Sequence, residues 1–443
     1  MLMPSFRVVC GLLSFVSISV VAAPAALTPI GAESGANAAA TIPAWAGGLT
    51  KVAAGFKEGD HYRNPFPDDK PLYTVTAANM ASHAANLTVG QQALLKKYPS
   101  WKMTVYPTRR TAAYPQAVYD ATAENPARVQ LVDGGNGFIG TSVGVPFPQP
   151  KVGVEVIWNH ITAYRGDSFT TSSRQVAVTA SGDYTPVRFE TVFDFHYNNL
   201  KKAPEDREPN KLVNFMQSTT APARLAGQAL LVHEYIDQTK NPRMAWTYNP
   251  GQRRVRLAPN VAYDNPGAAS DGLRTNDDFA LFNGATDRYD WQLVGKKELL
   301  VPYNSYALGS DALKIDDIVR PGHINPDHAR YELHRVWVVE ARLKKGISHL
   351  YSRRTFYVDE DSWSIVVADT YDTRNQLWRV SELHTLQAPN IPALLPAAEV
   401  HHDLLSGRYL VSGLINEESQ VYRRANYRSG DFSPSALRRA GTR

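Results

Sequence analysis

The chain has 443 residues, of which 43% are hydrophobic and 20% are charged, and this composition excludes a disordered or fibrous protein. Its 47 Lys and Arg residues against 42 Asp and Glu residues give a net charge of +5, which is too small and too evenly spread to indicate a nucleic-acid-binding protein. The length is ample for a large hydrophobic core that needs no disulfide or metal ion to hold it together.

The first 25 residues (1–25) have the pattern of a cleaved secretory signal peptide. Arg7 precedes an apolar stretch from Val8 to Val21, and small residues follow over 22–25. The single cysteine, Cys10, lies inside the apolar stretch, so the mature chain is expected to contain no disulfide and no thiolate metal site. A large exported chain without cysteine favours the bacterial periplasm over a eukaryotic exterior.

Residues 26–130 are expected to form an N-terminal extension with short helices. Its beginning is rich in Ala, Gly and Pro, which predicts extended or looped chain laid over a surface. Thr88 followed by Gln91 resembles a capping box and predicts a helix near 88–98. A second helix is predicted over 115–125, because its first residue is a proline, which suits the first turn of a helix.

The segment 134–150 is dense in glycine and proline, which excludes regular structure and predicts a loop or a boundary. Two catalytic-looking motifs lie within it. Gly135–Gly140 matches the dinucleotide-binding fingerprint, and Gly140–Gly144 matches the nucleophile elbow. Both motifs need a helix directly after them, and the prolines that follow exclude one, so we reject nucleotide binding and a serine nucleophile here.

From about residue 184 onward, alternation of apolar and polar residues predicts antiparallel β-strands. One face of the first such strand carries Val187, Phe189, Thr191, Phe193, Phe195 and Tyr197. Further strands are predicted over 228–237, 243–249, 252–258, 333–343, 348–359, 363–372, 376–387 and 407–414. Turn signals at this spacing, without long helices between them, favour antiparallel pairing over βαβ units. Asn249-Pro250-Gly251 predicts a hairpin turn, and Ser433-Pro434 predicts a last helix that ends at Gly441.

The histidines show no pattern that is typical of a metal site. His233-Glu234 begins like a zinc-protease helix, but Asp237 replaces the second histidine and the segment alternates like a strand. His323, His328 and His334 are scattered along the chain, and no ligand spacing connects them. No metal and no cofactor are therefore expected.

Three groups of adjacent acidic residues could support acid/base chemistry or bind calcium. They are Asp277-Asp278, Asp316-Asp317 and Asp359-Glu360-Asp361. Adjacent acids in turns are more often exposed caps or partners of nearby arginines, such as Arg353 and Arg354, so a structural role is favoured and no residue is assigned as catalytic.

Aromatic residues are abundant in the predicted strands. Six are candidates for contact with a hydrophobic ligand: Trp246, Tyr248, Trp337, Tyr351, Phe356 and Trp363. Strand aromatics are normally part of the core. A sheet that curls but does not close, however, offers an apolar concave face to a lipid. The sequence leaves both roles open.

Five segments resemble a family of secreted Gram-negative proteins known as the domain of unknown function 1329 family. They are LTPIGAESGANAAATIPAWAGG (27–48), GVPFPQPKVGVEVIWNH (144–160), YNPGQRRVRLAP (248–259), GLRTNDDFALFNGATDRYDWQLVGKKELLVPYNSY (272–306) and RYELHRVWVVEARLKKGISHLYSRRTFYVDEDSW (330–363). Together they span nearly the whole mature chain. The family has no established catalytic residues that could be carried over.

That family is regarded as similar to the outer-membrane lipoprotein-sorting proteins of the LolA/LolB type, in which an unclosed antiparallel barrel with a helical lid holds acyl chains. The resemblance implies an α+β fold that is mainly antiparallel β, with a large curved sheet or unclosed β-barrel and short helices as the lid. We expect the extension over 26–130 and the half-barrel over 131–443, with an insertion near 260–330. Family members are often encoded beside RND-type exporters and an outer-membrane protein, which implies these as partners.

The sequence therefore favours a non-enzymatic periplasmic carrier or adaptor that binds a lipid, an acyl chain or a lipoprotein and serves an RND-type export system. Two alternatives stay open. One is a structural subunit of a cell-envelope assembly that uses a sheet edge or the basic C-terminal segment (417–443) as its contact. The other, with less support, is a periplasmic hydrolase that uses carboxylates such as Asp359 and Asp361.

Overall fold

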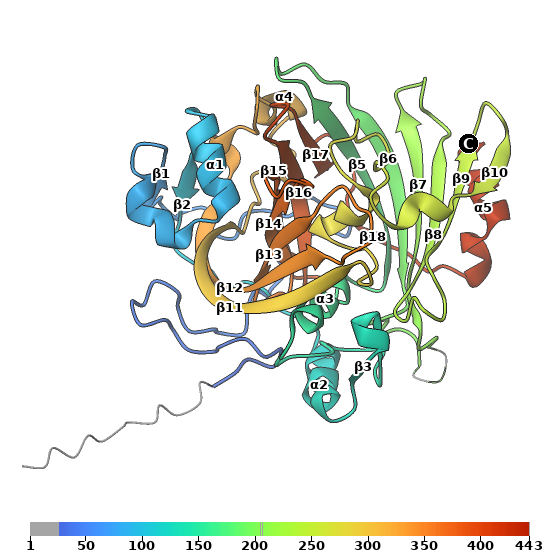
Figure 1. Cartoon of the computed structure of the whole chain (residues 1–443), viewed down its shortest axis with the longest axis horizontal. Coiled ribbons are helices and arrows are strands. Elements are labelled where there is room, and N and C mark those ends of the chain that lie inside the picture. Colours follow the sequence, from blue (N-terminus) through green and yellow to red (C-terminus); the bar gives the residue numbers. More distant parts are fainter. Residues whose placement is uncertain (1–25, 204, 206, 443) are drawn as a thin grey trace, which may run out of the picture.

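The computed structural model describes residues 26–442 with the exception of 204 and 206. The predicted signal peptide, 1–25, lies outside the described residues. Sixteen strands within the described part form one large sheet (Figure 1). They are β1 (Tyr73–Val75), β2 (Met103–Val105), β5 (Ser168–Val178), β6 (Val187–Phe195), β7 (Lys211–Ala221), β8 (Ala229–Tyr235), β9 (Met244–Asn249), β10 (Arg254–Leu257), β11 (Tyr289–Pro302), β12 (Tyr331–Leu343), β13 (Arg353–Asp359), β14 (Ile365–Tyr371), β15 (Leu377–Ala388), β16 (Ala393–Asp403), β17 (Tyr409–Leu414) and β18 (Arg423–Arg424).

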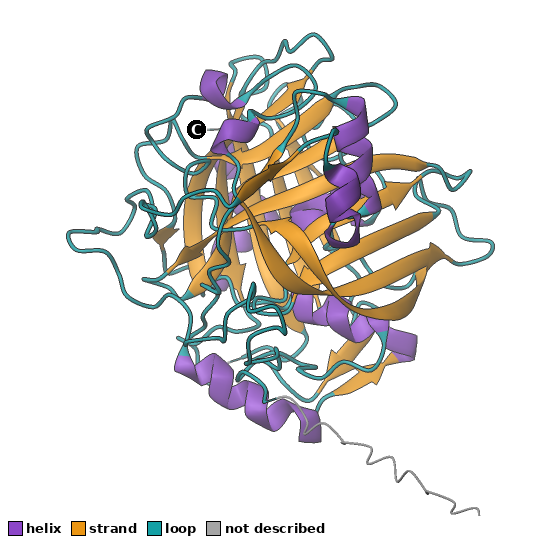
Figure 2. Cartoon of the chain, turned by 90° about the vertical axis from the view of Figure 1, so that its left-hand side faces the viewer, coloured by secondary structure: helices purple, strands orange, loops and turns teal. Residues whose placement is uncertain are grey.

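The sheet is open. Its strand order is β1-β2-β12-β13-β14-β15-β16-β17-β5-β6-β7-β8-β9-β10, while β11 pairs with β12 and β18 pairs with β5. Neighbouring strands run antiparallel, apart from a parallel contact of β2 with β12. Figure 2 shows the long strands curving across the molecule, with short helices and loops packed around them. The predicted fold, a large curved and mainly antiparallel sheet that does not close, is confirmed.

Seven strands of the sheet were not predicted: the short strands β1, β2 and β18, and the long strands β5, β7, β11 and β16. The sequences of the long ones are rich in serine, threonine and alanine, as in SFTTSSRQVAV, or interrupted by charges, as in YDWQLVGKKELLVP. Such strands lack the run of β-branched and aromatic residues that makes alternation visible. The predicted strands and the hairpin between β9 and β10 are confirmed, with ends that differ by a few residues.

Five short α-helices surround or fill the sheet: α1 (Val89–Lys97), α2 (Gln116–Glu124), α3 (Gly153–Ile161), α4 (Ile315–Ile318) and α5 (Pro434–Gly441). The capping box of α1 is present, since the backbone N–H of Gln91 donates to Oγ1 of Thr88 at 3.0 Å. The predicted helices α1, α2 and α5 are confirmed. Helix α3 was not predicted; eight of its nine residues are buried, including the polar Asn159 and His160, so it is a core helix. Among the described residues, no helix is both long and apolar enough to cross a membrane.

Short 3-10 helices and one small hairpin complete the elements. The 3-10 helices are η1 (Met80–Asn86), η2 (Asn125–Ala127), η3 (Asp133–Gly135), η5 (Pro259–Ala262), η6 (Asn276–Leu281), η7 (Pro326–His328) and η8 (Ser429–Phe432). The hairpin pairs β3 (Gln130–Val132) with β4 (Gly137–Ile139). The prediction that 134–150 contains no regular structure was therefore wrong for β4 and for part of η3, where glycines permit the tight turn between the two strands.

The beginning of the described chain lies against the sheet. Nε1 of Trp363 donates to the carbonyl of Ile30 at 3.1 Å, and Gly31 has a φ of 91°. A Cβ atom at Gly31 would lie 1.9 Å from the carbonyl oxygen of Pro148, so only glycine allows this close approach. Strands β1 and β2 also come from the N-terminal extension and join the large sheet. The division of the chain at residue 130 stays a prediction.

Candidate functional site

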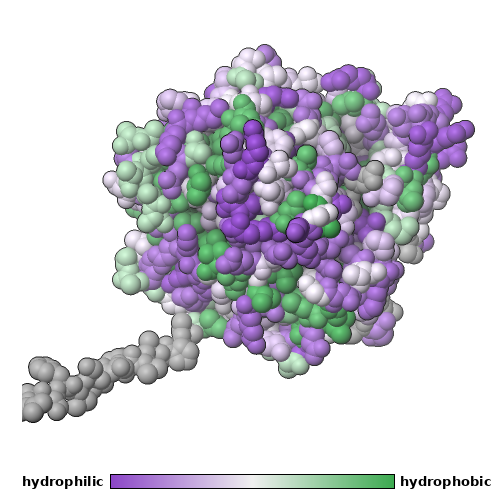
Figure 3. Space-filling view, in the orientation of Figure 1, coloured by the Kyte–Doolittle hydropathy of each residue, from purple (hydrophilic) through white to green (hydrophobic). Residues whose placement is uncertain are grey.

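A cavity of about 230 Å³ lies between the two halves of the sheet. Strands β5, β6, β7 and β8 contribute one side of its wall, and β15, β16 and β17 contribute much of the other. The 3-10 helix η6 adds a third part of the wall. Figure 3 shows hydrophilic and hydrophobic residues interspersed on the face seen in Figure 1, so the cavity, rather than this face, is the candidate binding site.

Strand pairing builds a row of apolar side chains across this cavity. Phe169 of β5 is paired with Phe193 of β6, which is paired with Phe215 of β7, and Phe215 is paired with Val232 of β8. All four line the cavity. Ring centroids of Phe193 lie 4.9 Å from Phe169 and 5.2 Å from Phe215, which are normal distances for packed aromatic rings.

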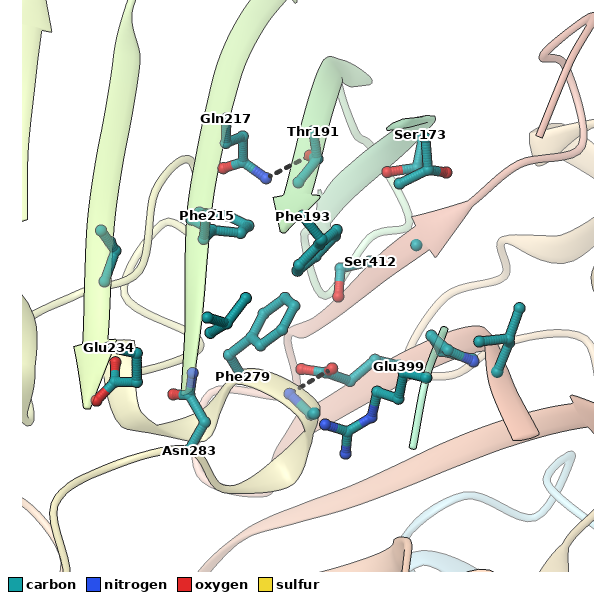
Figure 4. A pocket seen from close by; sticks show the side chains of 18 of the residues that line it. Ser173, Thr191, Phe193, Phe215, Gln217, Glu234, Phe279, Asn283, Glu399 and Ser412 are labelled. Atoms are coloured by element: carbon teal, nitrogen blue, oxygen red, sulfur yellow. Dashed lines mark hydrogen bonds between the residues drawn. The ribbon is translucent and has the colours of Figure 1, made fainter. Parts of the chain in front are cut away.

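Polar side chains form the next row along the same strands. Thr171, Thr191 and Gln217 are register partners in β5, β6 and β7, and Nε2 of Gln217 donates to Oγ1 of Thr191 at 3.2 Å. Figure 4 shows this polar end together with Ser173, and it shows Phe193 and Phe215 below it. The predicted face of β6 thus points into the cavity, since Phe189, Thr191, Phe193 and Phe195 all line it.

The 3-10 helix η6 inserts Phe279 between the sheet halves. The Phe279 ring lies 6.1 Å from that of Phe215 and 6.4 Å from that of Phe193 (Figure 4). The next two residues, Ala280 and Leu281, have φ values of 52° and 66°, in the left-handed region that costs about 1–2 kcal/mol for a residue with a Cβ. The backbone N–H of Ala280 donates to Oε2 of Glu399 at 2.9 Å, which holds this conformation.

Buried ion pairs attach η6 to the sheet. Nη2 of Arg354 lies 2.7 Å from Oδ2 of Asp277, and the hydroxyl of Tyr351 donates to Oδ2 of Asp278 at 2.9 Å. His349 contacts the same Asp277 oxygen at 3.1 Å. Asp277 and Asp278 thus serve as buried partners of Arg354, in keeping with the structural role that the sequence favoured for adjacent acidic residues.

The six aromatic residues predicted to contact a ligand lie elsewhere. Trp363 is fully buried and stacks on Trp337 at 6.3 Å, and Phe356 packs against Phe282 at 5.5 Å. Tyr351 is buried beside Arg354, with the guanidinium 4.8 Å from its ring centroid.

Trp246 and Tyr248 are on β9, in the cluster that contains Leu437 of α5. The described residues that line the cavity include none of the six. Their contact with a ligand stays a prediction. The structure brings Trp337, Phe356 and Trp363 into one core cluster and Trp246 and Tyr248 into another.

A second group of titratable residues is buried at β12 and at the end of β13, away from the cavity. His334, Asp359 and Asp361 offer atoms that all lie within 4.8 Å of one another. Nδ1 of His334 is 3.3 Å from Oδ1 of Asp359, and its Nε2 is 3.2 Å from Oε2 of Glu332. Arg110 binds Asp361 through two hydrogen bonds, of 2.6 and 2.8 Å. The scattered histidines of the sequence gave no sign of this group.

These residues form an internal ion-pair network. Burial alone would lower the pKa of His334, but the carboxylates of Asp359 and Glu332 raise this pKa to about 9. The network links β12, β13 and the segment that carries Arg110, and its carboxylates are not among the described residues that line the cavity.

The pKa of His334 predicts a pH dependence of stability. Because the pKa is higher in the folded chain than the ordinary 6.5, the stabilisation is fully present below pH 6.5 and is lost as the pH rises toward 9. We expect the free energy of unfolding to fall by about 3 kcal/mol over this range. Urea denaturation between pH 6 and 9.5 would measure it.

His334→Gln is the matched variant, and its unfolding free energy should fall much less than that of the wild type between pH 6.5 and 9. Glu382, whose pKa burial raises to about 7, titrates in both proteins and cancels in the comparison. Equal slopes for the wild type and the variant would contradict the assignment.

Comparison with known proteins identifies the family. The model of the family described as protein of unknown function DUF1329 matches residues 74–438. The uncharacterized protein PA3922 of Pseudomonas aeruginosa is 49% identical over 420 residues, which cover 94% of this chain and 92% of that protein.

Three solved structures overlap with part of this fold. A domain named for outer membrane lipoprotein sorting, from Vibrio parahaemolyticus, has a TM-score of 0.42 and 11% identity and covers 62% of this chain and 94% of its own. A DUF1329 family protein from Desulfovibrio piger has a TM-score of 0.42 and 16% identity, and the match covers 61% of this chain and 92% of that protein. The LolA superfamily protein NE2245 from Nitrosomonas europaea has a TM-score of 0.38 and 15% identity, and the match covers 64% of this chain and 98% of that protein.

The family expected from the five resembling segments is thus confirmed by a match over most of the chain. At identities of 11–16%, the likeness to the solved structures concerns the fold alone. The chain belongs to the DUF1329 family of proteins of unknown function.

Proposed function

We propose that this protein is a carrier that binds a hydrophobic ligand, such as a lipid or an acyl chain, in the cavity between the two halves of its sheet. The observation that carries the proposal is the row Phe169, Phe193 and Phe215, with Phe279 of η6 packed beside it. A cavity that is mostly apolar and has a few placed polar groups is typical of a site for a small hydrophobic molecule.

Apolar burial supplies the binding energy in this proposal. Each CH₂ group that leaves water contributes about 0.8 kcal/mol before ordering costs, so an acyl chain is retained without a covalent or catalytic step.

The compartment and the partners are part of the proposal. The predicted signal peptide supports export to the periplasm, and the gene neighbours typical of the family support service to an RND-type exporter and an outer-membrane protein. A hydrolase that uses Asp359 and Asp361 has less support, because Arg110 and Ser362 already bind these carboxylates in the interior. A structural subunit of an envelope assembly would need no ligand in the cavity.

Placing a charge in the phenylalanine row tests the proposal. We expect the delipidated wild type to bind cis-parinaric acid, a fluorescent fatty acid, and Phe215→Asp to weaken this binding more than tenfold, because a buried carboxylate without a partner is strongly disfavoured beside an acyl chain. Fluorescence titration measures both affinities.

Trp337→Asp is the matched control, because Trp337 is also a half-buried strand aromatic but lies outside the cavity lining. It should leave the affinity within twofold of the wild type. Circular dichroism of both variants verifies folding. A wild type that binds neither parinaric acid nor hexadecanol would overturn the proposed function, and a loss on Trp337→Asp alone would move the site to the aromatic residues predicted from the sequence.

A further inference from the structure

The cavity wall has more positively charged than negatively charged side chains. Among the described residues that line the cavity, the ionised side chains are those of Arg165, Arg243, Arg274, Glu234 and Glu399. Arg243 forms an ion pair with Glu234. Glu399 is bound by Nε2 of His401 at 2.6 Å and by the backbone N–H of Ala280 at 2.9 Å. Two arginines are left without a carboxylate of their own.

Arg165 follows helix α3 and lines the cavity with a partly exposed side chain. Its Nη2 donates to the carbonyl of His160 at 3.3 Å, and no carboxylate of the described residues lies within 4 Å of its guanidinium. Burial lowers the pKa of Arg165. The buried Arg354 shows the opposite, because Asp277 and Asp278 outweigh burial and raise its pKa. Arg165 thus has no carboxylate in ion-pair contact. The more distant Glu399 raises its pKa only in part, and this carboxylate is already bound by His401 and by the backbone N–H of Ala280.

Arg274 is the second unbalanced cation. It is only 9% exposed, and its Nε has no hydrogen-bond partner. Its guanidinium lies 5.7 Å from the ring centroid of Phe279, and no described carboxylate is within ion-pair distance of it. Burial of a cation in this way is unfavourable unless an anion or further hydrogen bonds compensate it. Both arginines can therefore bind an anionic group of a ligand, because no carboxylate of the described residues is in ion-pair contact with either of them.

The rest of the wall suits an amphiphile. The phenylalanine row separates the hydroxyl and amide groups of Thr191 and Gln217 from the end of the cavity that contains Glu234 and Glu399 (Figure 4). A ligand with an apolar chain and one acidic group would bury the chain against the phenylalanines. Its acid would form a charge-assisted hydrogen bond with a guanidinium, which is the group best suited to carboxylates and phosphates.

We propose that the ligand of this cavity is an anionic amphiphile, whose carboxylate or phosphate pairs with Arg165 and Arg274 while its acyl chain lies on the phenylalanine row. This inference rests on the proposed carrier function and specifies the class of its ligand. A free fatty acid and an acidic phospholipid share the chemistry that the arginines recognise.

Two matched pairs of ligands test the inference on the delipidated mature protein. Palmitate and hexadecanol have the same chain length and differ in charge, and dioleoylphosphatidylglycerol and dioleoylphosphatidylcholine differ in the net charge of their headgroups. We expect the anionic member of at least one pair to bind at least tenfold more tightly, as measured by competition with cis-parinaric acid and by native mass spectrometry. Preference within the first pair identifies a free fatty acid, and preference within the second identifies an acidic phospholipid whose phosphate has no cationic headgroup partner.

Substitution of the arginines assigns the preference to them. Arg165→Met and Arg274→Met should each weaken binding of the preferred anion about tenfold and leave hexadecanol within twofold. Arg256→Met is the control, because Arg256 is exposed on β10 outside the cavity lining. Arg165→Lys keeps the charge and should keep most of the preference, which separates loss of charge from loss of folding.

The outcomes distinguish the inference from the function on which it rests. Equal affinity for the charged and neutral members of both pairs would overturn the inference and leave the carrier function standing. A protein that binds none of the four molecules would overturn both. An anion preference that both Arg→Met variants retain would also overturn the inference, because it would place the recognition of charge elsewhere.

Discussion

Arg354→Met is expected to lower the free energy of unfolding by about 3–5 kcal/mol, because removal of one partner of a buried ion pair leaves the other charge uncompensated. The Arg354 side chain is 0% exposed, and its Nη2 lies 2.7 Å from Oδ2 of Asp277. Arg354 also packs on the rings of Tyr351, Tyr289 and Phe282. Methionine replaces much of this packing but leaves Asp277 without its cation.

The neighbouring Arg353→Met is the matched control. Arg353 is in the same strand, but its side chain is 20% exposed and its ion pair with Glu340 is only partly buried. Such a pair contributes less than about 1 kcal/mol. Urea denaturation at pH 7 gives both values, and equal losses for the two variants would contradict the importance of the 277–354 pair. Because Asp277 belongs to η6, Arg354→Met should also increase hydrogen exchange of the backbone amides in this helix.

Arg110→Met is expected to have an effect of similar size, about 3–5 kcal/mol, for the same reason. Its side chain is 2% exposed and binds Asp361 through two hydrogen bonds. The same guanidinium donates to the carbonyls of Glu33, Ser34 and Pro43, at 2.7, 3.3 and 3.2 Å. One side chain therefore connects the beginning of the described chain to the sheet.

A second measurement distinguishes this role from general destabilisation. Hydrogen exchange in native conditions should rise in residues 27–45 of Arg110→Met before it rises in β13 and β14. Arg109→Met is the control, because the Arg109 side chain is 44% exposed and pairs with Asp69 instead. Its loss should stay near 1 kcal/mol or below. Uniform acceleration across the sheet in Arg110→Met would contradict the local role.

Sequence alternation predicted one face of the cavity correctly. Phe189, Phe193 and Phe195 alternate with polar residues over a whole strand, so the pattern is visible in a short window. The partners of this face were missed, because Phe169 lies in a strand dominated by serine and threonine and Phe215 lies in one with mixed polarity.

Other parts of the site have no local signal at all. Arg165, Phe279 and Glu399 are far apart in the sequence and meet only after the sheet has folded. Aromatic content likewise fails to identify a ligand wall, because aromatic residues occur in both places: Trp363 is in the core and Phe193 lines the cavity. Which face of a strand is covered depends on the elements packed over it, and these come from distant segments.

The contacts of the first described residues set an order for folding. Ile30 and Trp363 are hydrogen-bonded across 333 positions, and Glu33 and Glu360 across 327. During vectorial synthesis the early segment therefore emerges long before the strands that receive it, and closing so long a loop has an entropic cost that only an already formed sheet can offset. Docking of residues 27–45 is thus a late step, which joins the start of the polypeptide to strands made near its end and completes the molecule.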